Sequence, residues 1–418
     1  MSLQVTKLEN GLHIVTDTME SVKSLTVGAW IRVGSRYEAP QLNGISHVLE
    51  HMVFKGTTRR SANKIVEDIE SVGGHINAYT SRENTAFFAK VLYQDLPLAV
   101  DIISDLVCHP TLKQQELERE QDVIEQEINN TKDTPEDLVF DHFQETAFPH
   151  QAIGKPVMGT AQLIKNIERK ALIGYMNDHY CSERIIMAAA GKVDHETFVH
   201  LVKQSFQNTP GTQELCVQPS RYVGGDYRQE RAIEQLHLVI GFNGLAHSHP
   251  DYYSISLLSI LLGGGMSSRL FQEAREKRGL VYNISAFSTS YEDCGLFGIY
   301  SASSGSQISE LISVICKELT SVCDRISLEE LERAKMLLKS SVIMGLESTS
   351  SRCESAAQQL QIFGRPLPTN EIIAQIESIP KSSISEVARR LFEKVPTVSA
   401  IGPITQLEDY GEIIERLT

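Results

Sequence analysis

The feature that most constrains the fold is an order of sequence patterns that occurs twice along the chain of 418 residues. In the first half, alternating apolar residues predict two strands within 8–34 around a turn at Asn10-Gly11, and a helix and a hairpin are predicted at 43–54 and 73–92. The second half repeats strands, helix and hairpin at 224–244, 252–271 and 280–302. The chain is therefore predicted to contain an internal structural repeat.

Long helical patterns follow each hairpin, including 113–131 in the first half and 327–348 in the second. Strands mixed with helices in this order predict an α+β fold of two homologous domains, each a mainly antiparallel sheet backed by α-helices. The polar segment 209–220, which contains Pro and Gly and lacks periodicity, is the predicted linker. The predicted domains are thus 1–208 and 221–418.

Charge and cysteine content narrow the class of protein. With 53 acidic against 39 basic residues the net charge is −14, which disfavours a nucleic-acid binder. The acidic excess would attract cationic ligands such as basic peptides, or it only aids solubility. The seven cysteines are scattered without a C-x-x-C pair, which suits a reducing compartment. No apolar run is long enough to span a bilayer, so we expect a cytoplasmic protein without a membrane partner.

A possible metal site lies in the first half, in the stretch His47-Val48-Leu49-Glu50-His51. Residues four apart share one face of a helix, so both imidazoles can reach one ion, and Glu50 stands beside the same point. Zinc takes such ligands but needs a third from the protein. A helix that merely exposes solvated His and Glu side chains explains the isolated motif as well.

The second helical pattern supplies candidates for that third ligand. Glu120 and Glu127 are seven residues apart, two helical turns, and so lie on one face. One carboxylate could complete the site and the other could hydrogen-bond a ligating histidine. In the second half the equivalent positions are Ala334 and Ser341. The fold itself therefore does not require these glutamates.

The H-x-x-E-H order is that of the inverted zinc peptidases. Together with "GISHVLEHMVFKGT", "GGHINAYTSRENT" and "LLGGGMSSRLFQEAREKRGLVYNISAF", it makes the chain resemble the pitrilysin family, in the bacterial branch similar to mitochondrial processing peptidase. The resemblance implies that His47, His51 and Glu127 ligate one Zn²⁺ per chain, that Glu50 is the general base, and that Glu120 supports the site.

The same resemblance assigns substrate contacts. In "NAYT", Asn77 and Ala78 match an edge strand that binds extended peptides, and Arg275 and Tyr282 match a pair that holds the substrate backbone and stabilises the oxyanion. Ordinary edge and surface positions fit these residues equally well when they are taken alone. Further substrate-binding candidates are Phe54, for the residue after the cut, and Asp137 and Asp141, for a basic residue before it.

The predicted function is that of a zinc metalloendopeptidase acting on peptides or on unfolded or presequence-like polypeptides. The family builds its chamber from four similar domains and this chain has two, so the resemblance implies a homodimer with composite active sites. Two alternatives stay open. One is a non-catalytic core or assembly subunit of the same fold, and the other is a dedicated maturation protease that acts with a partner subunit.

Overall fold

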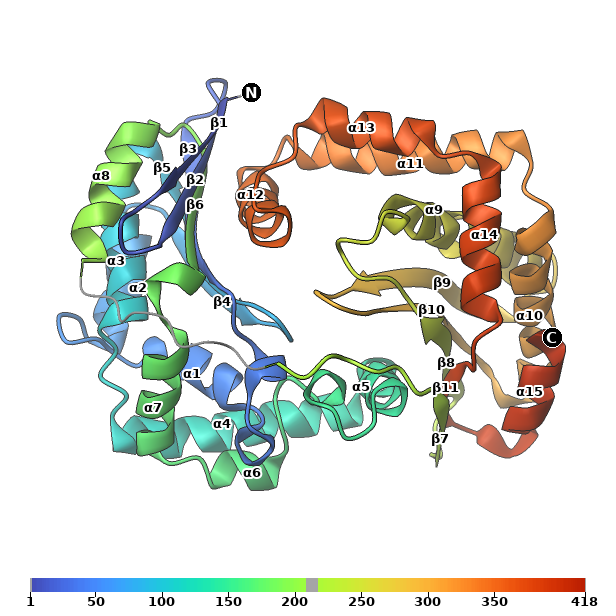
Figure 1. The fold of residues 1–418 in the computed structure, drawn as a ribbon. Helices are drawn as coiled ribbons and strands as arrows, with labels where there is room; N and C mark the ends of the chain where they lie inside the picture. Colours follow the sequence, from blue (N-terminus) through green and yellow to red (C-terminus); the bar gives the residue numbers. More distant parts are fainter. Residues whose placement is uncertain (1, 208–216, 418) are drawn as a thin grey trace. The chain divides into compact units, whose positions relative to one another are not determined.

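The chain is divided into two compact units, and each combines segments from both halves of the sequence. The computed structural model describes residues 2–207 and 217–417 (Figure 1). Unit 1 comprises Met1–Asn129, Lys155–Gln218 and Met344–Leu367, and unit 2 comprises Asn130–Gly154, Pro219–Ile343 and Pro368–Thr418. The predicted linker 209–220 lies largely outside the described residues, and the domain boundaries stay a prediction. Each unit nevertheless contains one segment from the other half of the sequence.

The sheet of unit 1 has six strands in the order β1-β2-β6-β3-β5-β4. All neighbours are antiparallel except β2 and β6, which pair in parallel. The turn predicted at Asn10-Gly11 joins β1 to β2, and Gly11 has a φ of 90° that favours glycine. Strand β1 precedes the predicted range 8–34, which contains β2 and β3. The strands are β1 (Ser2–Lys7), β2 (His13–Thr18), β3 (Ser24–Ile31), β4 (His75–Thr80), β5 (Thr85–Leu92) and β6 (Ile185–Gly191).

Both faces of this sheet pack against apolar side chains. Alternate residues of the strands belong to two different hydrophobic clusters, one on each face. Ala29 and Met187 lie in the main core of unit 1, together with apolar side chains of α1, α3 and α4. Their neighbours Trp30 and Ala188 face the other side, where they pack against α12, a helix from the second half of the sequence. Pattern analysis cannot assign α12 to this sheet, since an apolar helix face does not specify its partner.

The sheet of unit 2 has five strands in the order β7-β11-β8-β10-β9. Here β7 and β11 are the parallel pair, and the other neighbours are antiparallel. Helix α5, from the first half of the sequence, packs on β7, β8 and β11. Its buried side chains Val139 and Phe143 share a core with Val239 and Leu296. The strands are β7 (Gly225–Glu230), β8 (Gln235–Asn243), β9 (Val281–Ser290), β10 (Gly295–Ser304) and β11 (Thr397–Gly402).

The two sheets confirm the predicted repeat. Strands β2-β6-β3-β5-β4 of unit 1 have the same order and directions as β7-β11-β8-β10-β9 of unit 2, including the single parallel pair at the same place. Each sheet is mainly antiparallel and carries helices, as expected for the α+β fold. Strand β1 is an addition in unit 1 that has no counterpart among the described strands of unit 2.

Fifteen α-helices are described, and none of the helices within the described residues is long and apolar enough to cross a membrane. They are α1 (Ile45–Val53), α2 (Ala62–Glu70), α3 (Leu96–Cys108), α4 (Gln114–Asp133), α5 (Pro135–Ala147), α6 (Ala161–Lys165), α7 (Arg169–His179), α8 (His195–Ser205), α9 (Tyr252–Gly263), α10 (Ile308–Asp324), α11 (Leu328–Gly345), α12 (Thr349–Phe363), α13 (Thr369–Ser378), α14 (Lys381–Phe392) and α15 (Tyr410–Leu417).

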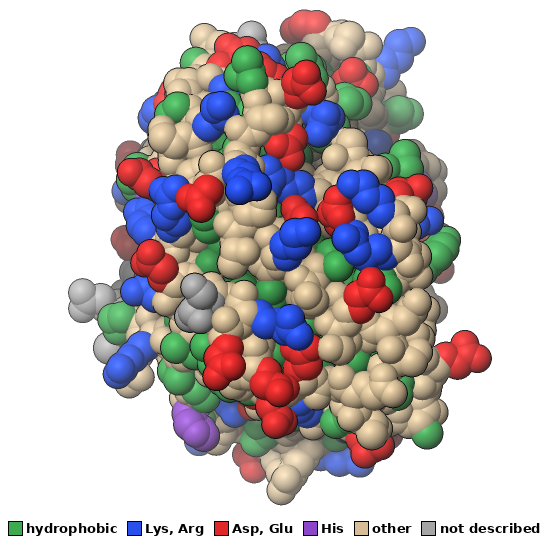
Figure 2. Space-filling model, turned by 90° about the vertical axis from the view of Figure 1, so that its right-hand side faces the viewer, with side chains coloured by type: hydrophobic (Ala, Val, Ile, Leu, Met, Phe, Trp, Pro, Cys, Tyr) green, Lys and Arg blue, Asp and Glu red, His purple; other side chains and the backbone are tan. Residues whose placement is uncertain are grey.

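The charged side chains of both signs are mixed where the surface is in view. On the face of the molecule drawn in Figure 2, Lys and Arg side chains lie among Asp and Glu side chains, and hydrophobic side chains are scattered. That face has no continuous basic surface of the kind that attracts nucleic acid. The mixture is typical of a surface whose charges favour solubility.

Candidate metal centre

The start of helix α1, which carries both histidines, is held by hydrogen bonds to a buried carboxylate. Gly44 precedes the helix with a φ of 100°, and the buried Glu38 carboxylate accepts hydrogen bonds from the backbone N–H groups of Gly44 (2.7 Å) and Ser46 (2.9 Å). A carboxylate at this position satisfies otherwise unpaired N–H groups and favours the helix dipole. Val48 and Met52 are buried in the core of unit 1, which directs the opposite, polar face of α1 toward α4.

Three candidate ligands converge between α1 and α4. The Glu127 Oε2 atom lies 3.7 Å from His47 Nε2 and 3.6 Å from His51 Nε2. One donor atom from each residue lies within 4.8 Å of the other two, and within the described part of the chain this is the only such group of three. Two imidazoles and one carboxylate are a donor set that zinc accepts, with a fourth position left for water. The residues present therefore fit a catalytic zinc ion.

His47 has the protonation state that a ligand needs. Burial, together with the neighbouring His51, lowers the pKa of His47 to about 4, so its imidazole is neutral at pH 7. Its Nδ1 atom is buried and has no hydrogen-bond partner in the described residues, whereas Nε2 faces Glu127. A neutral imidazole with a free lone pair is the form that binds a metal.

Glu120 orients the second histidine. Its Oε2 atom lies 3.0 Å from His51 Nδ1, and its Oε1 atom accepts from Lys55 Nζ at 2.7 Å. Burial acts to raise the pKa of Glu120, but the hydrogen bonds from His51 and Lys55 outweigh it and lower the pKa. The ionised carboxylate thus keeps a proton on Nδ1 and leaves Nε2 free for the ion. Lys55 was not among the residues predicted from the sequence.

Glu50 lies on the same helix and is held by strand β4. The Thr80 hydroxyl donates to Glu50 Oε2 at 2.5 Å. Burial raises the pKa of Glu50, while the hydrogen bond from Thr80 and the proximity of His51 act in the opposite direction. Sequence analysis did not assign Thr80, although strand alternation places it on the same face as Ala78, the face that packs against the core of unit 1.

Strand β4 is an edge strand beside α1, the position predicted for the strand that contains Asn77 and Ala78, and its binding of peptides stays a prediction. It ends the sheet order, so β5 is its only neighbour in the described sheet. Asn77 is exposed and Ala78 is half-buried, opposite Phe88 and Phe87 of β5. An extended peptide can pair with such an edge through backbone hydrogen bonds. Phe54, at the end of α1, packs against the core with its ring centroid 6.2 Å from that of Phe87.

The remaining predicted residues lie in unit 2. Arg275 belongs to a short π-helix, Phe271–Glu276, and its guanidinium carbon lies 5.0 Å from the ring centroid of Tyr282 and 4.7 Å from that of Phe271. Cation–π contacts with both rings position a guanidinium that has no acidic partner among the described residues. Tyr282 is 75% exposed. Asp137 and Asp141 lie on α5, Asp137 exposed and Asp141 half-buried.

Comparisons with known proteins identify the family of this chain. Residues 13–161 match the family model described as insulinase (peptidase family M16), and residues 166–338 match the model described as the peptidase M16 inactive domain. The chain belongs to peptidase family M16. The predicted resemblance to this family of zinc peptidases is thereby confirmed. The match to the inactive domain includes Ala334, the position that is equivalent to Glu120 in the sequence repeat.

Similar full-length relatives are known from bacteria and from mitochondria. An uncharacterised zinc protease of Streptomyces coelicolor is 37% identical over 96% of this chain and 89% of its own length. A probable mitochondrial-processing peptidase subunit beta of Arabidopsis thaliana is 36% identical over 99% of this chain and 81% of its own. The crystal structure of a protease from Helicobacter pylori superposes with a TM-score of 0.89 at 22% identity, covering 96% of this chain and 99% of that one, and so shows the same fold.

The contact between Glu120 and His51 leads to a testable prediction. In the variant Glu120→Gln the charged partner of His51 is lost, and we expect zinc affinity to fall by about 10–100-fold, because outer partners of ligating histidines contribute on that scale. Competition with a chromogenic chelator measures the affinity. The matched control is Glu118→Gln on the same helix, where Glu118 is exposed and accepts a hydrogen bond from Gln114 Nε2 at 3.1 Å. Equal affinities for the two variants would contradict the assignment.

Proposed function

We propose that this protein is a zinc-dependent endopeptidase in which Glu50 is the general base. The observation that carries the proposal is the convergence of His47, His51 and Glu127 beside Glu50. All four side chains come from helices α1 and α4 within unit 1, so their arrangement does not depend on the position of unit 2. Family membership and relatives named zinc proteases support the same activity.

The residues of the chain divide the chemistry between them. Zinc held by the three ligands would polarise the scissile carbonyl and acidify a water molecule. Glu50 accepts the proton of the attacking water and passes it to the leaving amine. Thr80 holds the Glu50 carboxylate in place by a hydrogen bond, and Glu120 fixes the tautomer of His51. The edge of β4, with Asn77 and Ala78, pairs with the extended substrate and sets its register.

The proposed substrates are peptides or unfolded, presequence-like polypeptides. Backbone pairing with an edge strand tolerates varied side chains, which favours a broad range of extended substrates. Asp137 and Asp141 are proposed to accept basic residues and Phe54 to contact the residue after the cut. Digestion of a mixed peptide library by the purified chain, with zinc analysis of the same sample, tests the activity. Cleavage that is independent of metal, or no cleavage by zinc-loaded protein, would overturn the proposal.

Two copies of the chain are proposed to complete each other's active site. Arg275 and Tyr282 then bind the substrate backbone and the oxyanion at the zinc site of the partner copy. A separate partner subunit is the second candidate, because several relatives are named as the beta subunit of a processing peptidase. The free cysteines and the acidic composition are consistent with a cytoplasmic protein, which we include in the proposal.

Mixing two inactive variants tests whether the sites are composite. We expect Glu50→Gln protein and Arg275→Ala protein to be nearly inactive alone and to regain activity when they are mixed, because one mixed site then contains both intact residues. Peptide hydrolysis by the mixture, compared with each variant alone at the same total concentration, is the measurement. No gain in the mixture, with exchange of copies verified by differential labelling, would contradict a homodimer with composite sites.

A further inference from the structure

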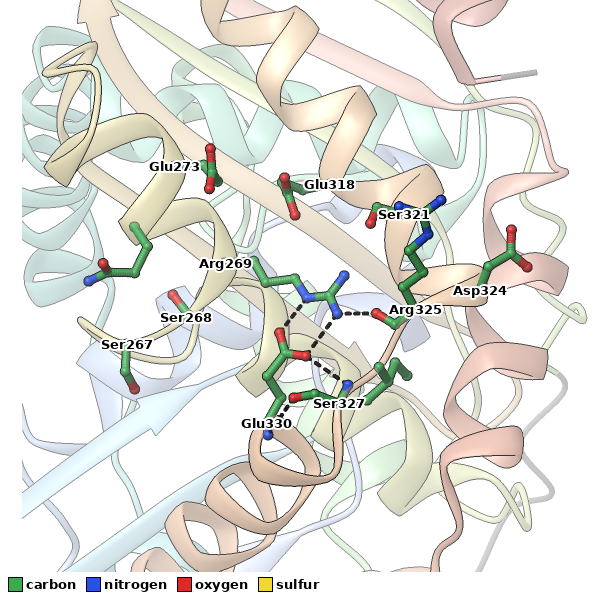
Figure 3. Close-up of a pocket in the computed structure, with 12 residues that line it drawn as sticks. Ser267, Ser268, Arg269, Glu273, Glu318, Ser321, Asp324, Arg325, Ser327 and Glu330 are labelled. Atoms are coloured by element: carbon green, nitrogen blue, oxygen red, sulfur yellow. Dashed lines mark hydrogen bonds and ion pairs between the residues drawn. The ribbon is translucent and has the colours of Figure 1, made fainter.

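A polar cavity of about 590 Å³ lies in unit 2 between the segment around the start of the π-helix, the C-terminal part of α10 and the start of α11 (Figure 3). On its wall, Arg269 Nε donates to Glu330 Oε1 at 2.7 Å, so these two charges neutralise each other. Glu318 and Arg325, which also line the cavity, carry opposite charges. The lining therefore favours neither a cation nor an anion, and the Arg269–Glu330 pair is a contact that holds two elements of unit 2 together.

Strand β4 of unit 1 is held on the face opposite α1 by helix α12, which comes from the second half of the sequence but belongs to the same unit. The Tyr79 hydroxyl donates to Glu354 Oε1 at 2.8 Å, and the same oxygen accepts from Gln358 Nε2 at 3.2 Å. Burial and the neighbouring Glu354 raise the pKa of Tyr79, so its hydroxyl keeps the proton that it donates. A hydrogen bond from a neutral phenol to a carboxylate is stronger than one between two neutral groups.

The ring of Tyr79 also belongs to an aromatic row that crosses three strands of the sheet. Its centroid lies 6.3 Å from that of Phe88 on β5, and Phe88 stacks with Trp30 on β3 at 6.4 Å. These rings share one hydrophobic cluster with the apolar side chains of α12. Tyr79 therefore anchors β4 by an apolar contact with the sheet and a polar contact with the helix.

Helix α12 has further polar anchors on other strands of the sheet. Arg352 Nη1 donates to both carboxylate oxygens of Asp17 on β2, at 3.1 Å each, and the Thr349 hydroxyl lies 2.9 Å from that of Thr26 on β3. The apolar side chains of α12 are buried in the cluster on the same face. Removing the side chain of Glu354 should therefore release β4 and leave the helix in place.

The two faces of β4 connect this contact to the proposed active site. Tyr79 lies between Ala78 and Thr80, and because successive side chains of a strand point to opposite faces, these two neighbours face α1. Thr80 holds Glu50 by a hydrogen bond, and Ala78 belongs to the edge that is proposed to pair with the substrate. An anchor at Tyr79 thus acts on both functions of the strand.

The end of β4 near Thr80 has a second support. The backbone carbonyls of Ser81 and Arg82, in the turn after the strand, accept hydrogen bonds from the N–H groups of Ser35 (3.2 Å) and Arg36 (2.9 Å). Loss of the contact at Tyr79 should therefore loosen the part of β4 that pairs with the substrate more than the part that holds Glu50.

We propose that Glu354 is a positioning residue of the active site, which holds the substrate-pairing edge of β4 in place through its hydrogen bond with Tyr79. The inference rests on the proposed function, because it requires that the substrate pairs with β4. It adds that a residue from the second half of the sequence, the half without the candidate metal ligands, sets the affinity for the substrate.

Steady-state kinetics on a quenched fluorescent peptide test this role. We expect Glu354→Ala to raise KM by about tenfold, the lower end of what a hydrogen bond to a charged group contributes, and to change kcat by less than about twofold. Glu354→Gln keeps an oxygen that can accept from Tyr79, so its KM should lie close to the wild-type value. Glu347→Ala, which removes an exposed carboxylate just before α12, is the matched control. Zinc content should be unchanged in all three variants.

Two further measurements do not need cleavage. Hydrogen–deuterium exchange measured by mass spectrometry should be faster in peptides covering β4 of Glu354→Ala than in the wild type, and unchanged in peptides covering β3. In the Glu50→Gln background, the Kd for fluorescein-labelled β-casein, an unfolded polypeptide, should rise in Glu354→Ala by the same factor as KM. Fluorescence anisotropy measures this Kd.

Unchanged KM together with unchanged exchange of β4 in folded Glu354→Ala protein would overturn the proposal. A fall in kcat at constant KM, or equally faster exchange in β3 and β4, would also overturn it, because Glu354 would then support unit 1 as a whole rather than one strand. Failure of the proposed function gives a different result, in which the wild-type protein neither cleaves peptides nor binds casein, and the role of Glu354 in substrate affinity then fails with it.

Discussion

Replacing Glu50 with Gln is expected to lower the rate of peptide hydrolysis by about 10²–10⁴-fold, the range that a general base contributes. Gln keeps the shape of the side chain and can still accept the hydrogen bond from Thr80, but it cannot take a proton from water. His47, His51 and Glu127 are unchanged, so zinc content should stay at the wild-type value. The measurement pairs initial rates on a quenched fluorescent peptide with metal analysis of the same preparation.

A matched control separates the loss of the base from a general loss of charge. Glu70→Gln removes an exposed carboxylate from the neighbouring helix α2 and should leave the rate unchanged. If Glu50→Gln retained the wild-type rate with full zinc occupancy, Glu50 would not be the base. If it lost zinc as well as activity, its role would be in the integrity of the site rather than in proton transfer.

Replacing Glu127 with Gln is expected to abolish stoichiometric zinc binding and, with it, activity. Glu127 is the only carboxylate of the three-residue group, and a neutral amide oxygen is a much weaker ligand. The loss of affinity should exceed the roughly 10–100-fold expected when an outer partner is removed. Metal analysis after dialysis measures it, together with thermal melting in the presence and absence of zinc.

Thermal melting gives this prediction a readout other than activity. A ligand that binds the folded state at 100 times its Kd stabilises it by about 2.7 kcal/mol, so zinc should raise the melting temperature of the metal-free wild-type protein. We expect a much smaller rise for Glu127→Gln. The control Glu125→Gln removes a carboxylate of the same helix that pairs with Lys165 at the surface, and it should behave like the wild type. Equal zinc-dependent shifts in all three proteins would place the ion elsewhere.

Much of the fold was predictable because strand and helix patterns repeat along the chain. The hairpin at 73–92 and the helices around His47 and Glu120 lie where hydrophobic periodicity placed them. The equivalence of the two sheets, down to one parallel pair in each, confirms the repeat. The packing of α12 on the first sheet and α5 on the second was not predictable, because each helix shows only that one of its faces is apolar.

The spacing of the candidate site residues along their helices was predictable, whereas the residues that hold them in place were not. The rise of the helix puts His47 beside His51 and Glu120 on the face of Glu127 for any sequence that forms these helices. Thr80, Lys55 and Phe271 carry no comparable signal, since threonine, lysine and phenylalanine are common in strands and on helices. Their contacts with Glu50, Glu120 and Arg275 become visible only in three dimensions.

The sequence by itself determined which residues share a helical face, because local backbone geometry fixes that relation over one or two turns. It also predicted one set of candidate metal ligands, which lies in the first of the two repeated halves. Only the tertiary structure decided that α4 approaches α1 closely enough for Glu127 to lie within 4 Å of both histidines. Core packing between residues far apart in the chain sets that approach, and no periodic pattern in the sequence indicates it.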